Sequence, residues 1–228
     1  MKTFEQYLEM ATPRSKDVDK KYYHGTNKVK DINDIIKNGI RPPDLTLRAK
    51  NKLTPRQGKV YITPDFVTAQ IYAIGADMAG HDWVDKNAIE EGRQFGYICI
   101  IDGKDLVDIE PDEDSIGHYI YRLLNKKPTE LSLKEQHFLH NNVEYKLTPR
   151  QKKLVKEGEY EEFAHVGKKI IQSMNIDDKF AVIDFPEESH IAHSGPTHPK
   201  EIWKFDLTET KNLKRDGSNF FKIAKRIK

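Results

Sequence analysis

The chain has 228 residues, of which 37% are hydrophobic and 32% are charged. This composition favours a folded chain over a disordered one, and the length suits one sizeable domain or a domain with an insertion. The net charge of +2 excludes a polycation, so any surface for nucleic acid has to be a local patch. No apolar run approaches the length of a membrane span, and we expect no membrane partner.

The single cysteine, Cys99, lies inside the apolar run GYICIIDG. One cysteine excludes an internal disulfide framework, and a place in a buried strand predicts an inert core thiol. Both features are typical of a reducing compartment, and we expect a cytoplasmic protein.

The first part of the chain is predicted to mix helices and strands. Residues 1–19 carry apolar residues at helical spacing, which predicts a short amphipathic helix and a charged linker. Residues 21–24 are predicted to form a strand, and residues 27–40 a helix that ends at Gly39. A basic, proline-rich loop is expected over residues 41–58.

A second strand and a second helix are predicted to follow this loop. The strand covers residues 59–64, and the helix covers residues 65–80 with Asp65 as its N-cap. Further strands are expected at residues 96–103 and 106–109. The ends of the strands at residues 21–24 and 59–64 and the helix at residues 65–80 therefore lie within the first 80 residues.

The rest of the chain is predicted to be helical first and then to return to strands. Residues 111–174 have a helical pattern, residues 179–185 and 201–207 are expected as late strands, and the tail ends in a basic helix. This order predicts an α+β domain that carries a helical insertion.

The expected domain organisation follows from this order of elements. We divide the chain into an N-terminal segment (1–19), a domain (20–207) with a helical insertion at about 112–176, and a basic C-terminal helix (208–228).

The segment KYYHGT ends a predicted strand with His24, Gly25 and Thr26. Glycine allows another group to approach the backbone closely, and histidine is a versatile polar group. Taken alone, a histidine at the end of a strand is more often structural than functional.

Two further segments carry candidate residues. VYITPDFVTAQIYA places Tyr61 and Thr63 at a strand end and Tyr72 on the following helix, and PKEIWKF opens a late strand with Glu201. Two such tyrosines are usually core aromatics, and a glutamate at the start of a strand is usually solvated.

In this order, the three segments resemble the diphtheria-toxin-like ADP-ribosyltransferases and the related poly-ADP-ribose polymerases, which use a His–Tyr–Glu triad. The resemblance covers about residues 20–110 and 179–207. It implies an α+β fold with a split β-sheet core of two packed small sheets, flanking helices and NAD⁺ as co-substrate, with no metal.

The resemblance also implies roles for the residues that bind nicotinamide. Tyr61 and Tyr72 would sandwich the cationic ring, with stacking and cation–π attraction of roughly 1 kcal/mol. Gly25 would let main-chain N–H and C=O groups reach the carboxamide, and Thr26 and Thr63 would be secondary contacts.

The catalytic residues implied by the resemblance are His24, Tyr61 and Glu201. His24 would bond a ribose hydroxyl, and the Glu201 carboxylate would stabilise the oxocarbenium-like ribose in the transition state. Four other glutamates compete for this role in the sequence. We prefer Glu201 over Glu161 and Glu162, which lie in the helical insertion, and over Glu187 and Glu188, which lie in the loop before the last strand.

The segment HIAHSGPTHP places His190, His193 and His198 within nine residues. A zinc site would need a compact set of four ligands, and no cysteine nearby completes one. A loop that recognises the acceptor is the preferred interpretation.

The sequence therefore predicts a mono-ADP-ribosyltransferase that transfers ADP-ribose from NAD⁺ to a macromolecule. A protein acceptor is favoured, and the basic tail keeps a nucleic-acid acceptor open. MKTFEQYLEMA resembles the capsid-targeting segment of internal head proteins of large tailed bacteriophages, which would imply an effector packaged in the virion and acting in the host cytoplasm. A plain amphipathic docking helix is the preferred alternative for this segment. The alternatives are an inactive NAD- or ADP-ribose-binding module and an RNA 2′-phosphotransferase.

Overall fold

The computed structural model describes residues 20–27, 32–42, 56–74, 94–106, 108–185, 190–214 and 216–228. These residues form an α+β structure with eight α-helices and two small antiparallel sheets. The chain divides into two compact units. The sheet unit contains the described residues up to Asp108 and from His193 onward, and the helical unit contains Ile109–Ala192.

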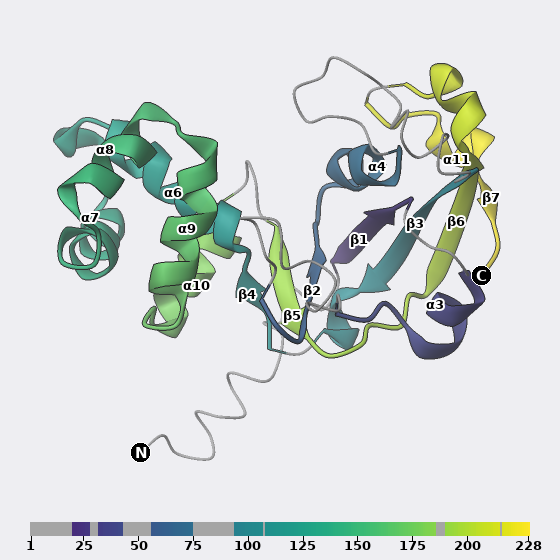
Figure 1. Cartoon of the computed structure of the whole chain (residues 1–228), viewed down its shortest axis with the longest axis horizontal. Coiled ribbons are helices and arrows are strands. Elements are labelled where there is room, and N and C mark those ends of the chain that lie inside the picture. Colours follow the sequence, from purple (N-terminus) through teal and green to yellow (C-terminus); the bar gives the residue numbers. More distant parts are fainter. Residues whose placement is uncertain are drawn as a thin grey trace. The chain divides into compact units, whose positions relative to one another are not determined.

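The larger sheet belongs to the sheet unit and has the strand order β1-β3-β6-β7 (Figure 1). All neighbouring strands are antiparallel. The register places His24 opposite Cys99 and Cys99 opposite Ile202. The predicted strands around residues 21–24, 96–103 and 201–207 are confirmed, and the strand bounds are β1 (Lys21–Thr26), β3 (Phe95–Asp102), β6 (Glu201–Asp206) and β7 (Lys225–Arg226).

Helix α4 (Phe66–Ile74) covers one face of this sheet. Asp65 caps the helix as predicted, because its carboxylate accepts hydrogen bonds from the main-chain N–H groups of Val67 (3.2 Å) and Thr68 (2.8 Å). The buried cluster beneath the helix consists of Ala73, Ile74, Ile98, Phe205, Leu207, Leu213 and Phe220.

The first helix that the structure describes in the sheet unit is α3 (Ile32–Asn38), and Gly39 follows it with φ of 75°. Only glycine adopts this left-handed conformation without strain, so the predicted helix stop at Gly39 is confirmed. Beyond it, the main chain of Ile40 forms a bridge with that of Thr197.

The second sheet contains β2 (Lys59–Ile62), β5 (Ile191–Ser194) and β4 (Glu110–Pro111). The boundary between the units falls within β5. In the helical unit, β4 pairs with the first residues of β5. In the sheet unit, the residue after β2, Thr63, forms an isolated bridge with Tyr23 of β1.

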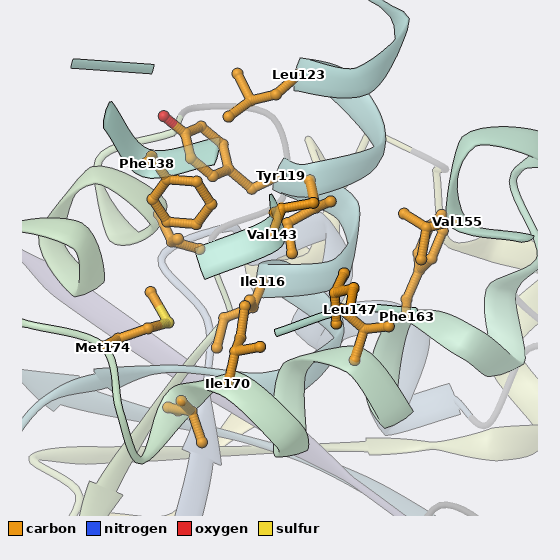
Figure 2. Packing of buried hydrophobic residues seen from close by; sticks show 14 residues of the cluster. Ile116, Tyr119, Leu123, Phe138, Val143, Leu147, Val155, Phe163, Ile170 and Met174 are labelled. Carbon is orange, nitrogen blue, oxygen red and sulfur yellow. The ribbon is translucent and has the colours of Figure 1, made fainter. Parts of the chain in front are cut away.

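The helical unit is built around a core of aliphatic and aromatic side chains (Figure 2). The predicted helical region is confirmed, and its helices pack closely where glycine removes a side chain. A Cβ on Gly117 of α6 would lie 2.3 Å from the Cα of Phe163 in α9. The helices are α6 (Glu113–Asn125), α7 (Leu133–Leu139), α8 (Pro149–Glu157), α9 (Tyr160–Ile171) and α10 (Ile176–Ile183).

Residues 179–185 do not form the strand that the sequence predicted, because 179–183 belong to α10, which ends at Ile183. Asn175 caps this helix by accepting a hydrogen bond from the N–H of Asp178 at 2.8 Å. The apolar run that suggested a strand supplies Val182 and Ile183 to the core. A local cap and burial therefore override the strand preference of these residues.

Two other predicted elements are also wrong. The described residues of the predicted strand at 106–109 are not in a strand: Leu106 ends a short 3₁₀ turn, and β4 begins at Glu110. The tail is not one basic helix, because it forms a 3₁₀ turn (Leu207–Asn212), the short helix α11 (Phe220–Ile223) and strand β7. The N-terminal segment and most of the basic loop lie outside the described residues.

The thiol of Cys99 is fully buried, as predicted, and burial raises its pKa to about 12. It is therefore a core residue rather than a nucleophile. Among the helices that the structure describes, none combines the length and the apolar character needed to cross a membrane.

Candidate functional site

His24 is held in one tautomer by a main-chain carbonyl. Its Nδ1 lies 2.9 Å from the carbonyl oxygen of Tyr61. A carbonyl only accepts hydrogen bonds, so Nδ1 carries the proton and donates it. Burial lowers the pKa of the His24 ring, and this effect is larger than that of the hydrogen bond to Tyr61, which raises the pKa. In the neutral ring, Nε2 is left as a hydrogen-bond acceptor.

The main-chain groups of Gly25 point away from β3. The N–H and C=O of Tyr23 both bond to Thr63 on the β2 side of β1, at 2.7 and 2.9 Å. Main-chain groups alternate in direction along a strand, so those of Gly25, two residues on, point the same way. Within the described part of the chain, neither group of Gly25 has a hydrogen-bond partner. A parallel donor and acceptor are therefore available beyond the Tyr23–Thr63 bridge.

The missing side chain of Gly25 is explained by helix α4. A Cβ on Gly25 would lie 1.7 Å from the carbonyl oxygen of Ala69 and 2.9 Å from the nitrogen of Ala73. A Cβ on Gly96 in the next strand would lie 2.4 Å from the oxygen of Ala73. The two glycines thus let the helix rest directly on the sheet, which is a different reason from the close ligand approach that the sequence suggested.

Tyr61 contributes two groups with different roles. Its carbonyl orients His24, and its hydroxyl accepts a hydrogen bond from the main-chain N–H of Arg56 at 2.8 Å. Thr63 is buried, and its hydroxyl accepts a hydrogen bond from the N–H of Asp65 at 3.0 Å. The structure therefore gives Thr63 a part in shaping the turn into α4.

Tyr72 and Thr26 complete the candidate set around β1. Tyr72 lies on α4, and 48% of its surface is exposed although Ala69 and Ala73 on the same helix are fully buried. Thr26 is the last residue of β1 and is partly buried. Tyr72 is thus partly exposed on the helix that covers β1.

Glu201 lies on the opposite face of the sheet from His24. It stands opposite Ile100 and thus shares a face with Tyr23, whereas His24 shares a face with Cys99 and Ile202. Its carboxylate accepts a hydrogen bond from Trp203 Nε1 at 3.0 Å and lies 3.8 Å from Arg226. The hydrogen bond of His24 thus brings Tyr61 to it, whereas the register places Glu201 on the other face of the sheet.

The other candidate glutamates are placed as follows. Glu161 and Glu162 lie in the first turn of α9, and Glu162 is partly exposed. Glu187 and Glu188 lie outside the described residues.

The three histidines of HIAHSGPTHP have different surroundings. His193 is buried and hydrogen-bonded to Thr197, and His198 is exposed. His190, in the helical unit, lies 3.7 Å from Asp112. Within the described ranges, no group of three or more His, Cys, Asp or Glu residues is arranged to hold a metal ion.

Compared with protein-family models, curated proteins and solved structures, the chain matches none of them. Its function is therefore argued from the residues themselves. The sequence missed the partner of His24 because that partner is a carbonyl oxygen, which every residue carries. The main-chain groups of a strand alternate in direction, and this regularity could have identified the N–H and C=O of Gly25 as a donor–acceptor pair.

Proposed function

We propose that the chain is an NAD⁺-dependent mono-ADP-ribosyltransferase that binds nicotinamide at Gly25. The observation that carries this proposal is the outward-pointing N–H and C=O of Gly25, beside a histidine with a fixed tautomer. The sequence resemblance assigns NAD⁺ to these same residues, so two separate arguments converge on one position.

A carboxamide is the chemical group that fits Gly25 best. It has one carbonyl acceptor and one NH₂ donor side by side, which match a main-chain N–H and C=O pointing in the same direction. Two such hydrogen bonds orient the ring as well as bind it. A carboxylate, as in nicotinic acid, has no donor and would place a negative charge against the carbonyl oxygen.

His24 fits a ribose hydroxyl. Its Nδ1 proton is engaged by Tyr61, so Nε2 can accept a hydrogen bond from a hydroxyl group. The lowered pKa keeps the ring neutral and the acceptor available at neutral pH. The main chain of Tyr61 thus acts as a positioning group for His24, and the rings of Tyr61 and Tyr72 are proposed to stack on nicotinamide.

In the proposed reaction, the bond between nicotinamide nitrogen and ribose C1′ breaks. The bonding electron pair leaves with nicotinamide, which becomes neutral, and positive charge develops on the ribose. A nucleophile of the macromolecular acceptor bonds to C1′ and loses its proton to solvent or to a base. The stabilising group in such a reaction is a carboxylate close to the ribose.

The position of Glu201 bears on which carboxylate acts. Because it lies on the other face of the sheet from His24 and is bonded to Trp203, we propose a structural role for Glu201 in the sheet unit. Glu187 and Glu188 are the alternatives that the sequence offers. We therefore test Glu201→Gln beside a Glu187→Gln/Glu188→Gln double variant, and expect the double variant to lose more activity.

The finer fold assignment is part of the same proposal. Two small sheets with an isolated bridge, Tyr23–Thr63, between β1 and the residue after β2 are compatible with the split sheet that the resemblance implies. The helices of Ile109–Ala192 then correspond to the insertion predicted at about 112–176.

A second candidate function is an inactive module that binds NAD⁺ or ADP-ribose. The position of Glu201 on the other face favours it, because a binding site without a carboxylate holds the dinucleotide but does not stabilise the charged ribose. Both functions predict binding at Gly25, and only the enzyme predicts release of nicotinamide.

The test incubates the full chain with labelled NAD⁺ and bacterial lysate. The proposal predicts nicotinamide release and a labelled macromolecule, both reduced at least tenfold in His24→Ala and unchanged in the matched control His137→Ala, which alters an exposed histidine of α7. Protease or nuclease treatment then identifies the acceptor. Binding of NAD⁺ without release would favour the inactive module, and absence of binding would reject both functions.

A further inference from the structure

The C-terminal part of the sheet unit carries a concentration of positive charge. We define the C-terminal edge as residues 200–206 and 212–228. Its described residues include seven basic and three acidic side chains, a net charge of +4. The whole chain carries only +2, so the remainder is net negative. The positive charge is therefore localised on one part of the molecule and points to an anionic partner.

An exposed aromatic ring lies within this charged edge. Phe221 of α11 is 47% exposed, although its ring is in contact with Trp203 (centroids 4.7 Å apart) and with Phe66 (5.1 Å). Phe66 in turn contacts Phe220 and Tyr23. The neighbouring rings fix the position of Phe221 and leave part of it open to solvent. A fixed, open ring is suited to stacking against a flat partner.

Basic side chains lie beside this ring. Arg226 stands opposite Trp203 in the β6–β7 pairing and therefore shares its face of the sheet. The Arg226 side chain is 54% exposed, and its Nε donates a hydrogen bond to the carbonyl of Lys228 at 2.8 Å. Lys222, next to Phe221 in sequence, is exposed. Ring and cations are thus presented together.

The opposite face of the same strands is also basic. Lys204 and Lys225 stand directly opposite each other, an arrangement of like charges that destabilises a sheet. Lys204 lies over the ring of Phe95, 3.6 Å from its centroid, and Asp206 offsets part of the charge. An anion bound along this edge would relieve the remaining repulsion.

The acidic groups of the edge do not cancel its charge. Glu201 faces Arg226 and Trp203, and Asp216 accepts a hydrogen bond from the N–H of Ser218 at 3.0 Å. Lys200 pairs with Asp105 at 3.3 Å. Lys214, Lys222, Lys225 and Lys228 are all exposed.

From this combination we infer that the C-terminal edge binds single-stranded nucleic acid. Phosphates are attracted by the basic side chains, and one base stacks on Phe221, as in proteins that bind single strands without sequence preference. An acidic peptide would satisfy the charges but would not require the ring. The inference does not rest on the proposed enzymatic activity, because binding is measured without NAD⁺.

The test measures fluorescence anisotropy of a labelled oligothymidylate with the full chain over a series of salt concentrations. We expect Phe221→Ala to weaken binding at least fivefold, in the range that loss of one stacked base produces. The matched control is Tyr145→Ala in the helical unit, where 79% of a tyrosine is exposed, and we expect no change. Equal effects of the two variants would overturn the inference.

Charge variants at exposed positions keep the test valid if Phe221→Ala loses structure. Arg226→Gln and Lys222→Gln should each lower the slope of log affinity against log salt by about 0.7, the value for one phosphate contact. Lys153→Gln, an exposed lysine of α8, should leave the slope unchanged. Polyglutamate that binds as tightly as the oligonucleotide, with no dependence on Phe221, would show a site for acidic peptides and reject the inference.

Discussion

The two units of this protein share one use of polar groups and differ in another. Side chains cap helices in both units, by Asp65 at α4 in the sheet unit and by Ser132 and Thr148 at α7 and α8 in the helical unit. In the sheet unit, the N–H and C=O of Gly25 have no partner in the described part of the chain. Unpaired polar groups are costly unless a ligand or water satisfies them, so the difference directs attention to β1.

Close packing at glycine occurs in both units, but the units surround it differently. In the helical unit, the close approach of α6 and α9 at Gly117 is combined with several capped helices around one side-chain core. The sheet unit depends on a close approach between α4 and β1, which tolerates no side chain at Gly25. We expect single substitutions to reveal this contrast, and hydrogen exchange can report on the two units separately.

The largest effect is expected for Gly25→Ala. Its Cβ would overlap the carbonyl oxygen of Ala69, and neither main chain can move without breaking the β1–α4 contact. We predict that the free energy of unfolding of the sheet unit falls by about 3 kcal/mol. The hydrogen-exchange protection of α6 and α9 should not change. The matched control is Gly58→Ala, where the Cβ would meet nothing within 4 Å and only the positive φ costs about 1 kcal/mol. Similar losses for both variants would contradict the close-approach account.

A second large effect is expected at Asp114 in the helical unit. Burial, followed by the nearby Asp112 carboxylate, raises the pKa of Asp114 to about 6. The folded state therefore holds this proton more tightly than the unfolded chain, and stability is lost as pH rises from the ordinary value of 3.8 through about 6. The Asp114→Asn variant should be more stable than the wild type by on the order of 2 kcal/mol at neutral pH, and equally stable in acid. A gain that is independent of pH would show that charge is not its cause.

Removal of a helix cap should have a smaller effect. Thr148 accepts a hydrogen bond from the N–H of Gln151 at 3.2 Å at the start of α8. We predict that Thr148→Ala destabilises the helical unit by about 1 kcal/mol in urea unfolding. The control is Thr129→Ala, an exposed threonine, which should change stability by less than about 0.5 kcal/mol. If Thr148→Ala lowered the stability of the sheet unit instead, the assignment of this cap to the helical unit alone would be contradicted.

The smallest effect is a pH dependence of the stability of the sheet unit, caused by His24. Because burial lowers its pKa, the unfolded chain binds the proton more readily, and stability falls as pH drops from the ordinary value of 6.5 toward the lowered pKa. Above this window His24 is neutral in both states and contributes no dependence. Hydrogen exchange of β1 should show this slope in the wild type and lose it in His24→Gln. An unchanged slope in the variant would assign the titration to another group.

The sequence predicted much of the fold because its signals are local. Asp65 capped α4 as expected, and Gly39 ended α3. The errors arose where a local preference competed with its surroundings. The run KFAVIDF has strand-like residues, but the Asn175 cap and burial against the helical core make it α10.

The candidate site was less predictable because it depends on register. A shift of one residue moves a side chain to the other face of a sheet, and no pattern in EIWKF specifies that Glu201 faces Tyr23 rather than His24. The tautomer of His24 depends on a carbonyl 37 positions away in sequence. Contacts of this kind appear only when the strands are placed.

The central claim is that the main chain of Gly25 binds a carboxamide, and titration of ¹⁵N-labelled protein with nicotinamide tests it most directly. We predict that the Gly25 amide resonance shifts downfield on binding, that His24 keeps its Nδ1 proton, and that nicotinic acid binds at least tenfold more weakly. An unshifted Gly25 resonance, or equal binding of nicotinamide and nicotinic acid, would contradict the claim.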